Sequence, residues 1–481
     1  MGFTAALLNK KGRDISNEIV DMLESASSSP SDGYGFGSHR GVIASKRLNR
    51  VELNSPSIVG YRLKKITYLD QIQPIFQSGV ASVFEGRLWR KSSPSDLIEA
   101  SELARFDSER LFSQNGSFIY VEINKDQIMC YRDPVGVVPI YLGESKELIG
   151  AASNRKMLYV NGLRNVNTLS PGKIVKISGK GFEFREATKL IRRPSPKISE
   201  EEAVEKLENL IAESVKAGSD HVSKASLGFS GGIDSYLLAY FLKENAVDID
   251  LVCAGMEGSL DFEIAEKAAD SLSLTLRIET IHPSQLESDL RFVLNSIEED
   301  DALKACIALP LYWATKSAFE HGSQVFFTGG GSDELFGGYL KYMNISKSSV
   351  RMAEDMMFKD IVESYRVNFE RDFKVCADLG VELRLPFADI SIINYALSLP
   401  IDLKIPKDSS GLRKPLLRAL AIEKGLDEEV ISKQKKAIQY STKVVREVNR
   451  LAKSRGLTME GFISKIYNEV EEKWMQIRKT I

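Results

Sequence analysis

Residues 227–235 read Leu-Gly-Phe-Ser-Gly-Gly-Ile-Asp-Ser, and this stretch decides the fold of the chain. An apolar run precedes it and apolar residues at helical spacing follow it, which predicts a strand, a tight turn and a helix. The two glycines allow a sharp turn and bring backbone N–H groups close to a ligand. Because a helix N-terminus carries a partial positive charge, the stretch predicts a phosphate-binding loop.

One carboxylate, Asp234, stands inside this predicted phosphate-binding loop. It would repel a phosphate unless a cation lay between them, so we expect Mg²⁺ to bridge Asp234 and phosphate oxygens. The lysine of a Walker loop is missing, which excludes that class of nucleotide site. The run Ser-Gly-Gly-Ile-Asp-Ser resembles instead the pyrophosphate loop of ATP pyrophosphatases, enzymes that split ATP into AMP and pyrophosphate. A plain strand–helix turn is the alternative interpretation.

A second glycine-rich stretch, residues 327–339, reads Phe-Thr-Gly-Gly-Gly-Ser-Asp-Glu-Leu-Phe-Gly-Gly-Tyr. It follows a predicted strand, and its glycine triplet lets the backbone lie against a flat ligand such as a nucleotide. Asp234 and Asp333, from the ends of neighbouring strands, are the two acids that a Mg²⁺-bridged triphosphate needs. The alternative is a glycine-rich loop with a solvated Asp-Glu pair.

The chain has 481 residues and a net charge of −2, with acids and bases interspersed. This length predicts two or three domains, and the charge pattern excludes nucleic acid as the main partner. The four cysteines lie too far apart for a zinc knuckle or a redox pair, and we expect them to be buried and reduced. Neither a signal peptide nor an apolar run of about 20 residues is present, so we expect a cytoplasmic protein that does not enter membranes.

Hydrophobic periodicity divides the chain into two domains, residues 1–191 and 198–481. Short strands, turn residues and few helices predict a sheet-rich α+β fold for the first domain. The second domain follows a polar linker and begins with a predicted capping box at Ser199.

In the second domain strands and helices alternate from residue 224, which predicts a doubly wound parallel α/β sheet. Beyond residue 345 the pattern is helical. The predicted strands are 224–229, 249–254, 274–280 and 324–328, and the predicted helices are 235–244, 261–272 and 284–297. Ligands of such sheets bind beyond the carboxyl ends of the strands, where both glycine-rich stretches fall.

Motifs of the first domain resemble those of class II glutamine amidotransferases, which have the N-terminal-nucleophile (Ntn) hydrolase fold. The matching stretches, in order, are residues 38–41, 83–86, 131–141 and 151–158.

This first resemblance departs from the family at two positions. The family has a nucleophilic cysteine after the initiator Met and an Asn-Gly pair that stabilises an oxyanion, whereas this chain has Gly2 and Glu85-Gly86. A carboxylate would repel the developing negative charge. We therefore expect a degenerate Ntn-hydrolase-like domain that does not hydrolyse glutamine, with structural roles for Arg40 and Asp133.

The second domain resembles the synthetase domain of the asparagine synthetase B family and the related β-lactam synthetase. Seven stretches match in the same order, namely residues 230–235, 255–259, 297–301 with 310–312, 328–339, 368–372, 381–389 and 433–437. The resemblance implies an ATP-pyrophosphatase fold and an adenylating half-reaction.

The second resemblance also implies site residues. ATP would be bound by Gly228, Ser230, Gly231, Gly232, Asp234, Ser235, Ala254, Thr328 and Gly329, and Mg²⁺ by Asp234 and Asp333. The catalytic residues would be Lys435, which stabilises charge on phosphate and on the tetrahedral intermediate, and Glu382. The substrate would be contacted by Glu298, Asp301 and Arg384. Alternatively, Lys435 belongs to a solvated charge run and Glu382 and Arg384 form a structural ion pair.

The part of the second domain that would bind the acceptor carboxylate, here called the acceptor half, departs from the family pattern. Gly330 stands where the family has a glutamate, and Cys306 and Ala308 stand where it has an arginine and a serine. We therefore expect an intact ATP half and an altered acceptor half.

The resemblance implies an ATP-dependent amide-forming ligase that acts through an acyl-adenylate. Its expected partners are a small carboxylate, foremost aspartate, and ammonia or an amine in place of glutamine, and a homodimer is expected. Intramolecular amide closure, as in β-lactam synthetase, is one alternative. A non-catalytic ATP-binding regulatory protein is the other.

Overall fold

The structure, a computed structural model, describes residues 1–48, 51–89, 96–406, 411–434 and 437–476. The chain divides into two compact units. The first unit comprises Met1–Lys189, Ala377–Gly380 and Tyr467–Ile481, and the second comprises Leu190–Cys376 and Val381–Ile466.

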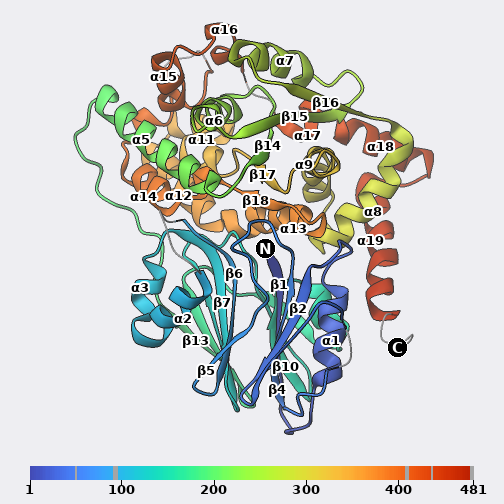
Figure 1. Ribbon diagram of the computed structural model, residues 1–481. Coiled ribbons are helices and arrows are strands. Elements are labelled where there is room, and N and C mark those ends of the chain that lie inside the picture. The colour runs from blue at the N-terminus through green and yellow to red at the C-terminus, as the bar shows by residue number, and fades with distance from the viewer. Residues whose placement is uncertain (49–50, 90–95, 407–410, 435–436, 477–481) are drawn as a thin grey trace. The chain divides into compact units, whose positions relative to one another are not determined.

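Two antiparallel sheets form the described part of the first unit, with strand orders β11-β9-β10-β1-β4-β2-β3 and β13-β12-β8-β7-β6-β5. Helix α1 packs on β1 and β4 of one sheet, and α2 packs on β6 of the other (Figure 1). The strands are β1 (Gly2–Asn9), β2 (Gly33–Ser38), β3 (Gly41–Ser45), β4 (Ser57–Leu63), β5 (Ile75–Gln77), β6 (Val80–Leu88), β7 (Gly116–Ile123), β8 (Gln127–Arg132), β9 (Tyr141–Glu144), β10 (Leu148–Ala152), β11 (Arg164–Thr168), β12 (Lys173–Ser178) and β13 (Gly181–Glu186). The helices are α1 (Ser16–Ser25), α2 (Asp96–Phe106), α3 (Ser108–Phe112) and α4 (Arg155–Tyr159).

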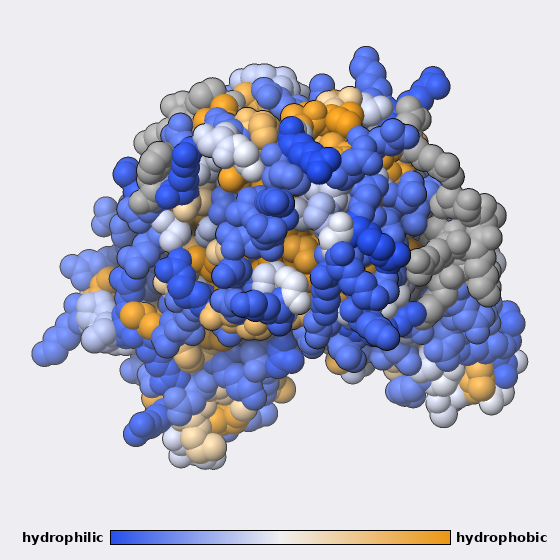
Figure 2. Space-filling view, turned by 90° about the horizontal axis from the view of Figure 1, so that it is seen from below, coloured by the Kyte–Doolittle hydropathy of each residue, from blue (hydrophilic) through white to orange (hydrophobic). Residues whose placement is uncertain are grey.

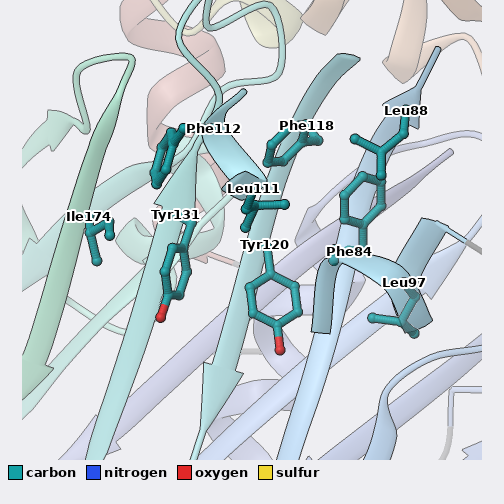
Figure 3. Close-up of a cluster of buried hydrophobic side chains, with 10 residues drawn as sticks. Phe84, Leu88, Leu97, Leu111, Phe112, Phe118, Tyr120, Tyr131 and Ile174 are labelled. Carbon is teal, nitrogen blue, oxygen red and sulfur yellow. The ribbon is translucent and has the colours of Figure 1, made fainter. Parts of the chain in front are cut away.

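An aromatic cluster covers one face of the sheet that contains β6, β7 and β8 (Figure 3). Side chains two residues apart on a strand share a face, so Phe118 and Tyr120 both point into the cluster. The rings of Phe84 and Phe118 stack with their centroids 5.3 Å apart. Leu97, Leu111 and Phe112, from α2 and α3, close the cluster, which explains why these helices lie against this sheet.

A parallel sheet of order β16-β15-β14-β17-β18 forms the described core of the second unit, and helices surround it (Figure 1). Its strands are β14 (Lys224–Gly228), β15 (Asp248–Met256), β16 (Leu276–Ile281), β17 (Val325–Phe327) and β18 (Glu382–Arg384). The helices that precede β18 are α5 (Glu200–Ser219), α6 (Ile233–Glu244), α7 (Asp261–Leu272), α8 (Leu286–Ile297), α9 (Ala302–Glu320), α10 (Ser332–Leu335), α11 (Leu340–Ser346), α12 (Val350–Ser364) and α13 (Glu370–Asp378). Those that follow it are α14 (Ile390–Ser398), α15 (Pro415–Glu423), α16 (Glu428–Ile431), α17 (Ile438–Ser441), α18 (Val444–Ser454) and α19 (Met459–Gln476), whose residues from Tyr467 onward belong to the first unit.

The predicted α/β fold class is confirmed. The alternation of strands and helices starts at β14 as predicted, and α7 has the predicted bounds Asp261–Leu272. The strand order reverses between β14 and β17, because β15 and β16 extend the sheet to one side and β17 and β18 to the other. Such a reversal is where open parallel sheets leave a crevice for a ligand.

The prediction that the chain is helical beyond residue 345 is wrong for Glu382–Arg384. These residues form β18, which pairs with β17 in parallel so that Glu382 lies opposite Val325 and Arg384 opposite Phe327. Three residues are too few to show a strand period, so the sequence pattern does not reveal this edge strand.

Hydrophilic residues dominate the face shown in Figure 2, with hydrophobic residues in smaller groups between them. This matches the interspersed charges of the sequence. Within the described residues, every helix is too short or too polar to cross a lipid bilayer.

Candidate functional site

The predicted phosphate-binding loop joins the end of β14 to the start of α6. Gly231 has φ +67°, and a Cβ on it would lie 2.7 Å from the carbonyl oxygen of Ile264, so only glycine fits. The Ser230 hydroxyl accepts a hydrogen bond from the N–H of Gly232 at 3.4 Å. The Ser235 hydroxyl donates to the carbonyl of Gly232 at 3.0 Å. Both serine hydroxyls therefore stabilise the turn at the N-terminus of α6.

The loop after β17 lies directly against the loop after β14. A Cβ on Gly329 would lie 2.8 Å from the Cβ of Asp234, which leaves room only for glycine there. Thr328 is held by a hydrogen bond from its N–H to the carbonyl of Arg384 at 3.2 Å. The two predicted strand-end loops thus meet at the point where the strand order reverses.

Asp234 and Asp333, the two predicted metal ligands, share one ammonium group. The Nζ of Lys414 lies 2.5 Å from Oδ1 of Asp234 and 2.7 Å from Oδ1 of Asp333. It also donates to the hydroxyl of Ser332 at 2.5 Å. The structure therefore brings the two carboxylates to one cation position, although they are far apart in the sequence.

Lys414 is a site residue that sequence reasoning missed. It adopts φ +63° at the N-cap of α15, and only 2 % of its surface is exposed. Gly338 packs against this pair, because a Cβ there would lie 1.9 Å from Oδ1 of Asp333 and 2.5 Å from Cε of Lys414. The basic pair Arg413-Lys414 before a helix-starting proline is the signal in the sequence, but such pairs are common at surfaces.

Arg418, on the first turn of α15, adds a second positive charge near this centre. Its Nε donates to the carbonyl of Arg413 at 2.7 Å, and its NH2 donates to the carbonyl of Lys433 at 3.1 Å. Burial lowers the pKa of Arg418, and the negative charge of Asp234 opposes this shift. Arg418 therefore ties the turn that holds Lys414 to the segment that contains Lys433.

The remaining predicted ATP-binding residues line the carboxyl edge of the sheet. Gly228 is the last residue of β14, and Ala254 lies two residues before the end of β15. The end of β15 is closed by a hydrogen bond from the N–H of Met256 to the carbonyl of Thr442 at 3.1 Å.

The predicted substrate residues are engaged by other protein groups. Glu298 is buried, and the Nζ of Lys374 lies 3.3 Å from its Oε2. Asp301 caps α9 by accepting the N–H of Lys304 at 2.8 Å. These contacts are the helix-capping and charge-pairing roles that acids take in many folds.

Glu382, predicted as catalytic, and Arg384, predicted to bind substrate, form a buried ion pair with each other. The NH2 of Arg384 lies 2.8 Å from Oε1 of Glu382, and its NH1 donates to the carbonyl of Gly218. This geometry favours the structural alternative for both residues. Lys435, the other predicted catalytic residue, lies outside the described residues.

The donor set fits Mg²⁺ held jointly by protein and substrate. In the part of the chain that the structure describes, no group of three or more His, Cys, Asp or Glu side chains is placed to hold a metal ion. Mg²⁺ is commonly held by one or two carboxylates with phosphate and water oxygens completing its shell. Asp234 and Asp333 supply the hard oxygen donors of that arrangement.

In the first unit, the position of the amidotransferase nucleophile is filled by an aromatic ring. A Cβ on Gly2 would lie 2.3 Å from the Cζ and the hydroxyl oxygen of Tyr61. Asp133 accepts N–H groups from Phe118, Val135 and Gly136, which is the structural role expected for it.

Glu85, which the resemblance aligns with the oxyanion-stabilising asparagine, is 1 % exposed. Its Oε2 accepts hydrogen bonds from the hydroxyls of Thr4 at 2.8 Å and Ser153 at 2.6 Å. Burial raises the pKa of the Glu85 carboxyl to about 7, and the two hydroxyls counteract this rise. An ionisable acid therefore stands where the glutaminase chemistry would need a neutral donor.

A Gly2→Cys variant is expected to release no glutamate from glutamine, since the new side chain collides with Tyr61 and the buried Glu85 stays in place of the asparagine. Overpacking of this kind costs about 2 kcal/mol of unfolding free energy. Glutamate release and the urea midpoint check both points, with wild type as the control. Glutaminase activity in Gly2→Cys would contradict this account.

The fold and the candidate site together define an α/β protein whose candidate ligand site lies where the strand order of a parallel sheet reverses. The family model described as asparagine synthase matches residues 206–360 and 346–468. The chain belongs to the asparagine synthase family.

Relatives carry the same family name. The Methanocaldococcus jannaschii protein named "Putative asparagine synthetase (glutamine-hydrolyzing) 1" is 29% identical over 420 residues, which are 77% of this chain and 76% of that protein. The Homo sapiens asparagine synthetase (glutamine-hydrolyzing) is 32% identical over 216 residues, or 43% of this chain and 38% of the human protein. This chain thus matches well under two thirds of the human protein's length.

Two solved structures show only distant similarity. The Bacillus subtilis glutamine phosphoribosylpyrophosphate amidotransferase, complexed with ADP and GMP, has a TM-score of 0.34 and 12% identity over 58% of this chain and 65% of that chain. NMN synthetase from Francisella tularensis has a TM-score of 0.28 and 13% identity over 59% of this chain and 98% of that chain.

Proposed function

We propose that this protein is an ATP-dependent ligase that forms an amide through an acyl-adenylate, with ammonia or an amine as the nitrogen source. The observation that carries the proposal is the meeting of Asp234 and Asp333 at one cation position beside the loop at residues 230–235. Membership of the asparagine synthase family supports ATP-dependent amidation in general.

In the proposed reaction, the substrate carboxylate attacks the α-phosphorus of ATP and pyrophosphate leaves. The N–H groups and hydroxyls of residues 230–235 would hold the pyrophosphate, and Gly228, Ala254, Thr328 and Gly329 would border the nucleoside. Asp234 and Asp333 would hold Mg²⁺, which neutralises charge on the phosphates. Ammonia would then attack the acyl carbon and release AMP, with Lys435 stabilising the tetrahedral intermediate.

Two features of the first unit favour ammonia over glutamine as the nitrogen source. The relatives named above are glutamine-hydrolyzing by name, whereas here Tyr61 lies against Gly2 and the buried Glu85 occupies the oxyanion position. Both features oppose a thiolate-based hydrolysis.

The acceptor is proposed to be aspartate or a related small carboxylate. A second candidate reaction, intramolecular amide closure, is favoured by the altered acceptor half. A Cβ on Gly330 would already lie 3.2 Å from Cδ2 of Leu385, so a glutamate does not fit there without a shift. A homodimer and a cytoplasmic location stay predictions.

The proposal is tested by pyrophosphate release in the presence of ATP, Mg²⁺, ammonium and a panel of carboxylates. We expect release that depends on one carboxylate and on ammonium, with AMP formed in equal amount. A parallel reaction with glutamine in place of ammonium should give no product. ATP binding without pyrophosphate release for any carboxylate, including amine-bearing ones, would instead favour the non-catalytic regulatory protein.

A further inference from the structure

The ammonium of Lys414 has three close partners at the candidate site. Its Nζ donates hydrogen bonds to Oδ1 of Asp234 and to the Ser332 hydroxyl, each at 2.5 Å, and forms an ion pair with Oδ1 of Asp333 at 2.7 Å. The side chain is 2 % exposed. Lys414 is therefore a part of the site and differs from a surface lysine that pairs by chance.

The backbone around Lys414 is shaped to keep the ammonium in this place. Its φ of +63° and ψ of +55° lie in the left-handed region, which a residue with a side chain adopts only under constraint. Pro415 fixes the first turn of α15 directly after it. The absence of a side chain on Gly338 leaves room for the lysine stem, since a Cβ there would lie 2.5 Å from Cε of Lys414.

A divalent cation and this ammonium compete for the same oxygens. Mg²⁺ lies about 2.1 Å from its oxygen ligands, so a Mg²⁺ on Oδ1 of Asp234 or Asp333 would lie within about 5 Å of Nζ. At that separation in a water-poor site, like charges repel strongly. Asp234 and Asp333 exceed this ammonium by a single negative charge, which is too little for a divalent cation in addition, and Arg418 adds further positive charge near Asp234.

A triphosphate removes this conflict, because its oxygens give the ammonium a second anionic partner. We propose that Lys414 is a built-in counter-cation that makes metal binding at Asp234 and Asp333 conditional on the nucleotide. This inference rests on the proposed function and deepens it. The site takes the metal together with a nucleoside triphosphate and rejects the free metal, and Lys414 donates to phosphate once the triphosphate is bound.

The test is a titration with Mn²⁺ alone, in which electron paramagnetic resonance measures the unbound ion. Wild type should bind Mn²⁺ at this site with a Kd above about 1 mM, whereas Lys414→Met should bind one Mn²⁺ at least about 10-fold more tightly. The double variant Asp234→Asn, Lys414→Met should lose the gained site. Lys424→Met is the matched control, because Lys424 follows the same helix but pairs with Glu208, and it should behave as wild type.

Wild type and Asp234→Asn together can overturn the inference, even if Lys414→Met fails to fold. Binding of one Mn²⁺ to wild type with a Kd below about 100 µM, lost on Asp234→Asn, would show that the ammonium does not exclude the free metal. Equal Mn²⁺ affinity of wild type and folded Lys414→Met would also overturn it. The titration measures metal binding and involves no turnover. Failure of the proposed ligase reaction would show instead in the pyrophosphate assay, so the two failures can be told apart.

Discussion

Replacing Asp234 by asparagine will lower substrate-dependent pyrophosphate release at least about 100-fold, because the site loses one of two charges that hold a cation against phosphate. The amide keeps the size of the side chain, and Lys414 keeps its contact with Asp333 at 2.7 Å, so the fold should survive. Initial rates at saturating ATP and Mg²⁺ measure the effect, and circular dichroism verifies folding.

The matched control for Asp234→Asn is Asp389→Asn. Asp389 is also a buried aspartate of the second unit, but its side chain caps α14 through the N–H of Ser391. Asparagine caps helices about as well as aspartate, so this variant should keep its rate. A rate of Asp234→Asn equal to that of wild type would defeat the metal assignment and with it the proposed function.

The second large effect is on stability, and it arises at Glu85. Burial raises the pKa of this carboxyl to about 7 in the folded protein, against 4.5 as its ordinary value. The folded state therefore holds the proton more tightly than the unfolded state. The free energy of unfolding therefore falls as the pH rises from about 4.5 to about 7. The total decrease is about 3 kcal/mol.

A Glu85→Gln variant should remove this pH dependence, because the amide stays neutral while it can still accept from Thr4 and Ser153. We expect equal stability of variant and wild type near pH 4.5 and a variant more stable by about 3 kcal/mol at pH 8. Guanidinium unfolding of the full chain at both pH values gives the difference. Glu183→Gln, at an exposed position of β13, should change neither value. A variant less stable than wild type at pH 8 would contradict the burial argument.

Much of the second unit could be predicted because its signals are local. The strand–turn–helix at residues 227–235 and the helix Asp261–Leu272 follow from apolar spacing alone. The capping box at Ser199 is present as predicted, with its hydroxyl accepting the N–H of Glu202. Such features depend on residues a few positions apart, which a sequence displays directly.

The features that escaped prediction depend on distant parts of the chain. Lys414 meets Asp234 across 180 positions, and its place follows from how α15 packs and not from its neighbours. Glu298 and Asp301 could be placed on a motif, yet their partners Lys374 and the N-terminus of α9 decide what they contact. Family patterns give the position of a residue, whereas tertiary packing gives its partner.

The ring of Tyr61 against Gly2 opposes any larger side chain at position 2. A change of Gly2 to cysteine would meet a steric collision first, and the acid at position 85 would still repel the negative charge that glutamine hydrolysis develops. Glutaminase chemistry here would need changes at Gly2, Tyr61 and Glu85 together. Under the proposed function, such a protein would take up nitrogen that arrives already free.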